Sequence, residues 1–189
     1  MENSRPISIP VILGTSRKGR ASAHAARFVA DQIRRRPGIV TEVLDVAEMA
    51  LPIDDAGEAI KDTSISEKLC KADALVIVSP EYNHSFPGLL KHMLDGYLKE
   101  YIHKAAGIVG VSAGAFGGTR GIQDLLPVLR ELGLVAIFWD VNIGPVSKVF
   151  DENGRLVDEA LVRRTEKFLD ELMWMARTLR YGRENIPIR

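Results

Sequence analysis

Five short apolar runs, separated by longer stretches with helical periodicity, constrain the fold of this 189-residue chain more than any other feature. Each run has the length of a strand, and the longer stretches repeat apolar residues at spacings of three and four. This alternation is typical of strand–helix units that build a doubly wound parallel sheet with helices on both faces. The predicted strands are Ile7–Leu13, Ile39–Val46, Ala74–Ser79, Ile108–Ser112 and Leu134–Trp139.

The helical stretches are predicted at residues 25–33, 89–98, 122–129 and 161–179. Pro37-Gly38 should stop the first, Pro127 should kink or restart the third, and Asp158 is a candidate N-cap of the last. The chain has the length of one α/β domain, and it contains no repeat or low-complexity linker. We therefore expect a single domain over residues 1–189.

The charge balance excludes several classes of partner. Lys plus Arg number 25 and Asp plus Glu number 25, so no global field favours nucleic acid or an anionic membrane, and any phosphate site must be local. No apolar run approaches the ~20 residues that span a bilayer, so we expect a cytoplasmic protein. Cys70, the only cysteine, is expected to be a buried core residue. The histidines form no metal-ligand pattern. Asp54-Asp55 could suggest a metal site, but a solvated loop is the favoured interpretation, and no metal is expected.

The loop after the first predicted strand, residues 14–22, is suited to a terminal phosphate. Ligands of doubly wound sheets bind beyond the carboxyl ends of the strands, and this loop offers hydroxyls, cations and glycines there. The helix that follows presents unpaired N–H groups and its positive dipole end. A solvated basic turn is the alternative. The loop lacks G-x-G-x-x-G, a Gly-Lys-Ser/Thr ending and any cysteine, which excludes a Rossmann dinucleotide site, a P-loop and a thiol phosphatase.

Two further loops follow strands at the same predicted edge. Residues 79–88 place an aromatic and polar run between two prolines, which favours a stiff loop able to hydrogen-bond the edge of a flat ring. Residues 111–121 contain four glycines, which would let a planar ligand approach the main chain. Each loop could instead be a turn without a ligand.

Together the three loops resemble those of the NADPH-dependent FMN reductase family of flavodoxin-like proteins. Residues 80–95 are similar to the family pattern P-E-Y-N-x-S-x-P-G-x-L-K-N-x-x-D at nearly every fixed position. The first loop resembles G-S-x-R-x-G-R/S, with Thr15 in place of a serine, and residues 112–120 resemble S-x-G-x-x-G-G-x-R. The resemblance covers residues 7–144 and implies a flavodoxin-like sheet of five parallel strands in the order 2-1-3-4-5.

The resemblance also implies which residues hold the cofactor. The FMN phosphate would be held by Thr15, Ser16, Arg17, Arg20 and Ser22. The ribityl chain and the isoalloxazine ring would meet Pro80, Glu81, Tyr82, Asn83 and His84, with the pyrimidine edge near Ser112, Gly114 and Gly117. Gly96 stands where the family often has tryptophan, which implies a more open acceptor pocket.

The implied activity is an NAD(P)H-dependent oxidoreductase with bound FMN. The flavin would take a hydride from NADPH or NADH and pass electrons, in a ping-pong cycle, to a quinone, free flavin, chromate or azo compound. No side chain is assigned as catalytic acid or base. Family members are usually dimers or tetramers, so a homo-oligomer is expected, with the helix that bears Tyr97 and Tyr101 as part of the subunit surface. The alternatives are a non-enzymatic electron carrier, disfavoured because such carriers are strongly acidic, and a module for another phosphate compound.

Overall fold

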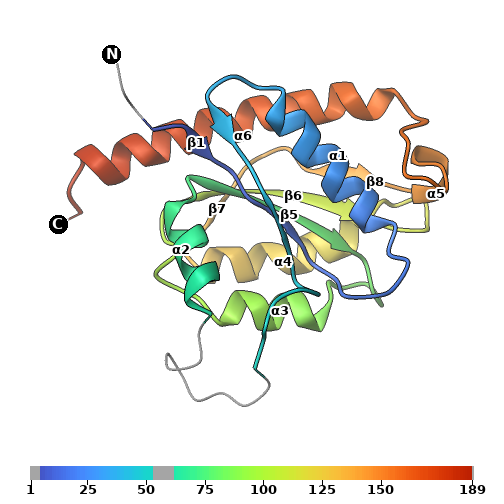
Figure 1. Cartoon of the computed structure of the whole chain (residues 1–189), viewed down its shortest axis with the longest axis horizontal. Coiled ribbons are helices and arrows are strands. Elements are labelled where there is room, and N and C mark those ends of the chain that lie inside the picture. Colours follow the sequence, from blue (N-terminus) through green and yellow to red (C-terminus); the bar gives the residue numbers. More distant parts are fainter. Residues whose placement is uncertain (1–4, 53–61, 189) are drawn as a thin grey trace.

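The computed structural model describes residues 5–52 and 62–188, and a parallel β-sheet lies at its centre (Figure 1). The strands follow one another across the sheet in the order β4 (Val43–Asp45), β2 (Val11–Leu13), β5 (Ala74–Pro80), β6 (Ala105–Val111) and β7 (Val135–Ala136), and β8 (Val141–Ile143) also pairs with β6. Every one of these pairs is parallel.

The first two predicted strands are each present in two pieces. A short pair, β1 (Ile7–Ser8) with β3 (Ile39–Val40), continues the line of β2 and β4. Pro10, which has no amide hydrogen, lies between β1 and β2 and interrupts the regular ladder. When β1 with β2, β3 with β4, and β7 with β8 are each counted as one strand, the predicted order 2-1-3-4-5 is confirmed.

The fifth predicted strand, Leu134–Trp139, is wrong in its bounds. Only β7 is regular within it, and the strand resumes at β8 after a loop over residues 137–140. In that loop the amides of Phe138 and Trp139 donate to the Glu171 carboxylate, at 3.1 and 3.2 Å, rather than to a strand. The fourth strand begins earlier than predicted, since β6 starts at Ala105.

Helices cover both faces of the sheet (Figure 1). One face packs against α1 (Ser22–Arg34) and α6 (Ala160–Asn185), and the other against α2 (Thr63–Lys71), α3 (Gly88–Asp95) and α4 (Thr119–Glu131). β5 supplies both cores, with Val76 and Val78 on the α1–α6 side and Leu75 and Ile77 on the other. The short α5 (Val146–Val149) precedes α6. None of the helices in the described residues is long and apolar enough to cross a bilayer.

Several local predictions differ from the structure. Pro127 does not restart a helix: α4 runs through it, with Pro127 exposed and Leu125 and Leu129 buried. Tyr97 and Tyr101 lie beyond the end of α3 rather than on it, and both side chains are buried in the core. Cys70 is exposed rather than buried, because it lies on the outer side of α2.

Two smaller predictions concern polar residues. The Asp158 carboxylate accepts from the Ala160 amide at 3.0 Å, but the N-cap of α6 is Glu159, one residue further along, and its side chain forms no capping bond. Asp54-Asp55, considered as a metal pair, lies outside the described residues.

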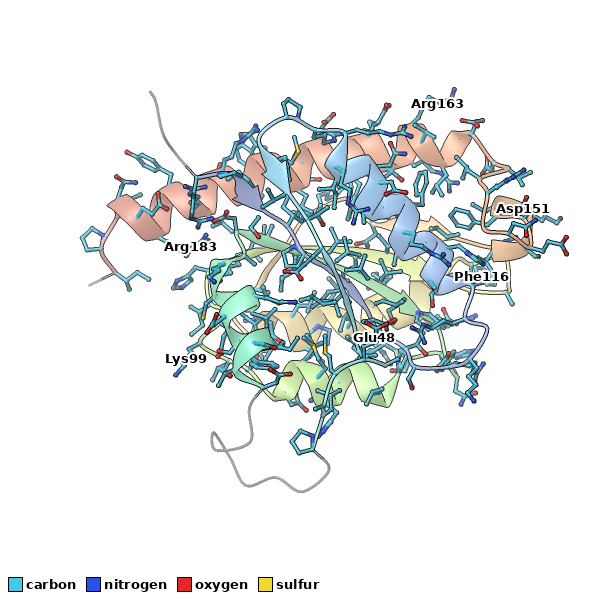
Figure 2. The ribbon with its side chains drawn as sticks, in the orientation of Figure 1. Glu48, Lys99, Phe116, Asp151, Arg163 and Arg183 are labelled. Carbon is cyan, nitrogen blue, oxygen red and sulfur yellow. The ribbon has the colours of Figure 1, made fainter. Side chains whose placement is uncertain are left out.

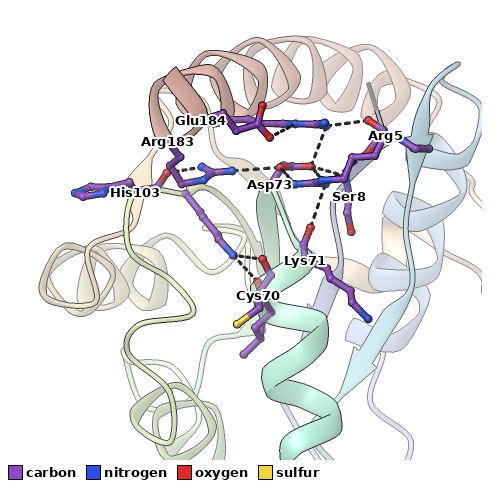
Figure 3. A network of polar contacts seen from close by, with 12 residues as sticks. Arg5, Ser8, Cys70, Lys71, Asp73, His103, Arg183 and Glu184 are labelled. Carbon is purple, nitrogen blue, oxygen red and sulfur yellow. Dashed lines mark hydrogen bonds and ion pairs between the residues drawn. The ribbon is translucent and has the colours of Figure 1, made fainter. Parts of the chain in front are cut away.

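A cluster of charges lies at the amino ends of the strands (Figure 3). The fully buried Asp73 carboxylate accepts from Arg5 at 2.7 and 2.8 Å and from Arg183 at 3.2 Å, and Arg180 lies 3.7 Å away. Nearby, Lys104 Nζ donates to the carbonyls of residues 69 and 70. Burial, and then the charge of Arg183, lower the pKa of Lys104 to about 8. The cluster joins the chain's amino-terminal segment, the start of β5 and the last turns of α6.

Candidate functional site

Three loops meet at the carboxyl ends of β2, β5 and β6, as the sequence predicts. The Gly14 amide donates to the Val78 carbonyl at 2.9 Å, and the Glu81 amide donates to the Val111 carbonyl at 2.9 Å. These backbone bonds join the first loop to β5 and the second loop to β6. Phe116, in the third loop, and Arg183, in the charge cluster, lie at opposite edges of the molecule (Figure 2). The site is therefore on the edge away from the charge cluster.

The first loop ends at the start of α1, where two buried polar atoms have no partner among the described residues. Ser22 Oγ and Arg20 Nε form no hydrogen bond, although both are shielded from solvent. No side chain caps α1, and its first turn contains no acidic residue. A buried donor left unpaired is costly, so an oxyanion at this helix start would supply what these groups lack.

The cations of the first loop differ in how they are held. Arg20 forms an ion pair with Asp45 at the end of β4, which fixes its guanidinium beside the loop. Ser16, Arg17 and Lys18 are exposed. A phosphate would therefore meet one anchored cation and a set of adjustable groups.

Tyr82 connects the second loop to the first. Its hydroxyl hydrogen-bonds Thr15 Oγ1 at 2.9 Å, and the Arg17 guanidinium lies 4.2 Å from the centre of its ring, a cation–π contact. Thr15 is buried, and its hydroxyl also accepts weakly from the Arg17 amide at 3.4 Å. These contacts bring the residues predicted to bind the phosphate and a residue predicted to contact the ring into one region.

The second loop leaves β5 at Pro80 and turns sharply. Tyr82 and Ser85 exchange both backbone hydrogen bonds, at 2.8 and 3.0 Å, around Asn83 and His84. Both central residues have positive φ, 50° and 70°, the pattern of a type I′ turn that Asn-Gly normally occupies. Residues with side chains rarely adopt this conformation, and such strain clusters at functional sites. The turn holds Asn83 and His84 exposed at the edge of the site.

Glu81 has a structural role that the sequence did not reveal. Its carboxylate accepts from the Arg120 amide at 3.1 Å and lies 3.6 Å from the Arg120 guanidinium, so it caps the start of α4. A methyl group on Gly121 would lie 3.2 Å from the Ser85 carbonyl oxygen. The second loop thus packs directly on the helix that follows the third.

The third loop divides its glycines between two tasks. Gly117 and Gly118 have positive φ and lie so close to Asn142 and the β6 backbone that a Cβ would clash, so they serve the tight turn. A Cβ on Gly114 would meet nothing within 4 Å. Ser112 Oγ donates to the Gly114 carbonyl at 2.8 Å, which holds the strand end of the loop in place.

Sequence reasoning missed Phe116, which lies among these residues. Its side chain is 66% exposed, and the Arg120 guanidinium lies 5.0 Å from the ring centre. A large aromatic residue between glycines in a loop was the available signal. Phe116 and Arg120 add an apolar, cationic surface beside Ser112 and Gly114.

Other features of the described residues lie away from this site. A pocket of about 280 Å³ between α1 and the turn at residues 151–154 is lined by none of the predicted site residues. In the described part of the chain, no three His, Cys, Asp or Glu side chains gather as metal ligands do.

Comparison with known proteins points to one family. The profile described as NADPH-dependent FMN reductase matches residues 7–144. An NAD(P)H-dependent FMN reductase of Pseudomonas aeruginosa is 31% identical over 152 residues, which cover 76% of this chain and 82% of that protein. A quinone reductase of Pseudomonas putida is 26% identical over 165 residues, 82% of this chain and 88% of the relative.

The fold has solved counterparts. The structure of a flavoenzyme NAD(P)H:(acceptor) oxidoreductase from Paracoccus denitrificans superimposes with a TM-score of 0.73 at 20% identity, covering 89% of this chain and 98% of that one. At this identity the likeness concerns the fold alone.

Proposed function

This chain belongs to the NADPH-dependent FMN reductase family, and from that premise we propose that it is an FMN-dependent oxidoreductase that passes electrons from NAD(P)H to a small-molecule acceptor such as a quinone. Free flavin, chromate and azo compounds are further acceptors within the proposal. The proposed FMN-binding domain comprises residues 1–189. The proposed compartment is the cytoplasm, where NAD(P)H is produced.

The observation that carries the proposal is the pair of buried, unpartnered atoms at the start of α1, Ser22 Oγ and Arg20 Nε. They lie in the loop that a flavin phosphate would enter, beside the Arg20–Asp45 pair and the positive end of the helix dipole. We propose that Thr15, Ser16 and Arg17 complete this phosphate site.

The other two loops would hold the ring. We propose that Tyr82, Asn83, His84, Ser112 and Gly114 line it, while Pro80, Glu81 and Gly117 shape the loops that carry them. The open space at Gly114 leaves room for a planar group against the main chain. Bound FMN would supply the hydride and electron chemistry, and the side chains would supply position and electrostatics.

No side chain in the site is asked to act as acid or base. Arg20 and Ser22 would bind the phosphate, and the strained turn at Asn83 and His84 would orient the ring's edge. The surface near Phe116 and Arg120 would receive the reductant and the acceptor in turn, which predicts ping-pong kinetics.

Spectroscopy of the purified chain tests the function. We expect a flavin absorption band, bleaching of that band by anaerobic NADPH or NADH, and its return when benzoquinone is added. A flavin band that NAD(P)H does not bleach would favour a non-enzymatic electron carrier. Failure to bind added FMN would favour a module for another phosphate compound, and either result would overturn the proposal.

A matched pair of ligands tests the phosphate site. FMN should bind much more tightly than riboflavin, which lacks only the phosphate, because charged hydrogen bonds contribute more than neutral ones. Equal affinities for the two would contradict the assignment of the first loop.

We also propose that the chain forms a homodimer or homotetramer.

A further inference from the structure

An exposed aromatic surface lies on the α6 side of the molecule, outside the site. We call Phe138, Trp139, Trp174 and Tyr181 the α6 aromatic patch. Phe138 is 79% exposed, Trp174 62% and Tyr181 63%. The first two residues come from the loop between β7 and β8, and the others from α6, which runs along the outside of the fold (Figure 1). Gathered exposed aromatic residues of this kind mark interaction surfaces.

The patch is held in a defined shape. Both Glu171 carboxylate oxygens accept from the backbone of the β7–β8 loop, one from Phe138 and one from Trp139. The two rings meet edge to face with centroids 5.0 Å apart, and Lys167 Nζ lies 4.7 Å from the centre of the Trp139 ring. Since the Phe138 and Trp139 rings are already held in place, little of their side-chain entropy remains to be lost on binding.

Helix geometry places Trp174 at the middle of the outward face of α6. The buried residues Phe168, Leu172 and Ala176 form the opposite stripe. At 100° per residue, Lys167, Trp174 and Tyr181 align one above another, seven residues apart. Glu171 and Arg177 lie three residues to either side of Trp174.

The residues along the outward face of α6 are complementary to those of a second copy of α6 that runs antiparallel to the first. When two copies of α6 cross antiparallel at Trp174, each residue before Trp174 faces the one equally far after it on the second copy. Glu171 then faces Arg177, an acid opposite a base, on both sides of the twofold axis. Lys167 faces Tyr181, a cation opposite an aromatic ring. A parallel arrangement would instead place like charges together.

We propose that the α6 aromatic patch is a twofold interface at which a second copy of this chain docks, with Trp174 on the axis. Trp, Tyr and Arg are the residues that dominate the energy of such contacts. The patch shares no residue with the proposed flavin site, so it would join subunits independently of any contact at that site.

Sedimentation velocity of the full chain tests the interface. The Trp174→Asp variant should form an assembly of half the wild-type mass, since the substitution places a charge on the twofold axis. Val157→Asp is the matched control, because Val157 is 61% exposed and lies outside the patch. This control should keep the wild-type mass. A monomeric wild-type chain, or a Trp174→Asp mass equal to wild type, would overturn the proposal and leave the patch to some other partner.

Cross-linking provides a second test that does not require disrupting the assembly. In a Cys70→Ser background, Trp174→Cys should yield a disulfide-linked dimer on mild oxidation, because the two sulfurs would meet on the axis. Val157→Cys in the same background should stay unlinked. Equal cross-linking of the two variants would overturn the proposal, whether or not the Trp174→Asp variant folds.

Discussion

Ser22 offers the most direct residue-scale test of the phosphate site. Its hydroxyl is buried and unpartnered at the start of α1. If it binds the FMN phosphate, Ser22→Ala should weaken FMN binding about tenfold, the effect of one hydrogen bond to a charged group, and leave riboflavin binding nearly unchanged. Flavin fluorescence titration measures both affinities.

Thr165 provides the matched control. Its hydroxyl is also buried without a partner, but it lies on the core side of α6. Thr165→Val should leave FMN affinity at the wild-type value. An equal loss in both variants would point to a general packing effect and against a phosphate contact at Ser22.

Asp140 should make stability depend on pH. Burial raises the pKa of its carboxyl to about 6 from 3.8. Between these values the folded protein keeps a proton that the unfolded chain releases, so the stabilisation is complete below about pH 4 and lost as the pH rises through 6. Asp140→Asn, which never ionises, should melt at a higher temperature than wild type at pH 7 and at an equal temperature near pH 4.

Calorimetry across this pH range measures the difference. Asp124→Asn removes an exposed carboxylate on α4 and controls for the change in net charge. A melting difference for Asp140→Asn that stays constant with pH would contradict the assignment.

At the residue scale, the sequence predicts the site's location better than its contacts. Thr15, Arg17 and Tyr82 come together as expected, because parallel strands bring their following loops to one edge. The capping role of Glu81 depends on where α4 begins relative to β5, a distance in space that spacing along the chain does not give. The sequence does not place Cys70 correctly, because a short helix exposes one side and the apolar neighbours of Cys70 do not show which side.

The packing of α6 on β6 depends on the absence of a side chain at Gly107. A Cβ on Gly107 would lie 2.6 Å from Cε2 of the fully buried Phe168. Gly107→Ala should therefore lower the free energy of unfolding by about 2 kcal/mol, a usual cost of overpacking, as measured by urea denaturation.

A second substitution distinguishes this clash from a simple loss of glycine. Phe168→Leu removes the obstructing ring, so the double variant should lose less stability than the two single effects summed. Gly96→Ala, whose Cβ would have ordinary contacts, should be nearly neutral. Strictly additive losses would show that Gly107 is needed for another reason.

At the element scale, strand order and layers could be predicted because apolar runs report burial on both faces. The predicted bounds of a strand are wrong where a side chain, rather than a neighbouring strand, accepts the backbone hydrogen bonds. Phe138 and Trp139 look like strand residues, yet their amides bond Glu171, which lies 33 and 32 residues further along the chain. Tyr97 continues the helical periodicity of α3, but its burial comes from packing beyond the helix end.

The charge cluster around Asp73 stabilises the molecule as a whole. Asp73→Asn would leave three arginines around a neutral side chain, and removing one member of a buried ion pair typically costs about 3 kcal/mol or more. We expect a loss of that size in urea denaturation. Arg5→Ala should cost less, since the Arg5 side chain is 48% exposed.

Flavin affinity separates this effect from damage to the site. Under conditions in which the Asp73→Asn variant is folded, its affinity for FMN should equal that of the wild type, because the charge cluster and the three loops of the site lie at opposite edges of the molecule (Figure 2). Unchanged stability would mean that the arginines find other acceptors. No sequence pattern indicated this cluster, since its members come from residues 5, 73, 180 and 183.

The separation of these two edges has a consequence for how such a protein can change over time. Residues 113–116 are exposed and lie far from the carboxylate that holds the chain's amino-terminal segment and α6 together. If the proposed acceptor surface lies there, mutations in these residues can alter which oxidant is accepted while the fold keeps its margin of stability. Duplicated copies of such a chain are thus free to diverge in chemistry without first having to become more robust.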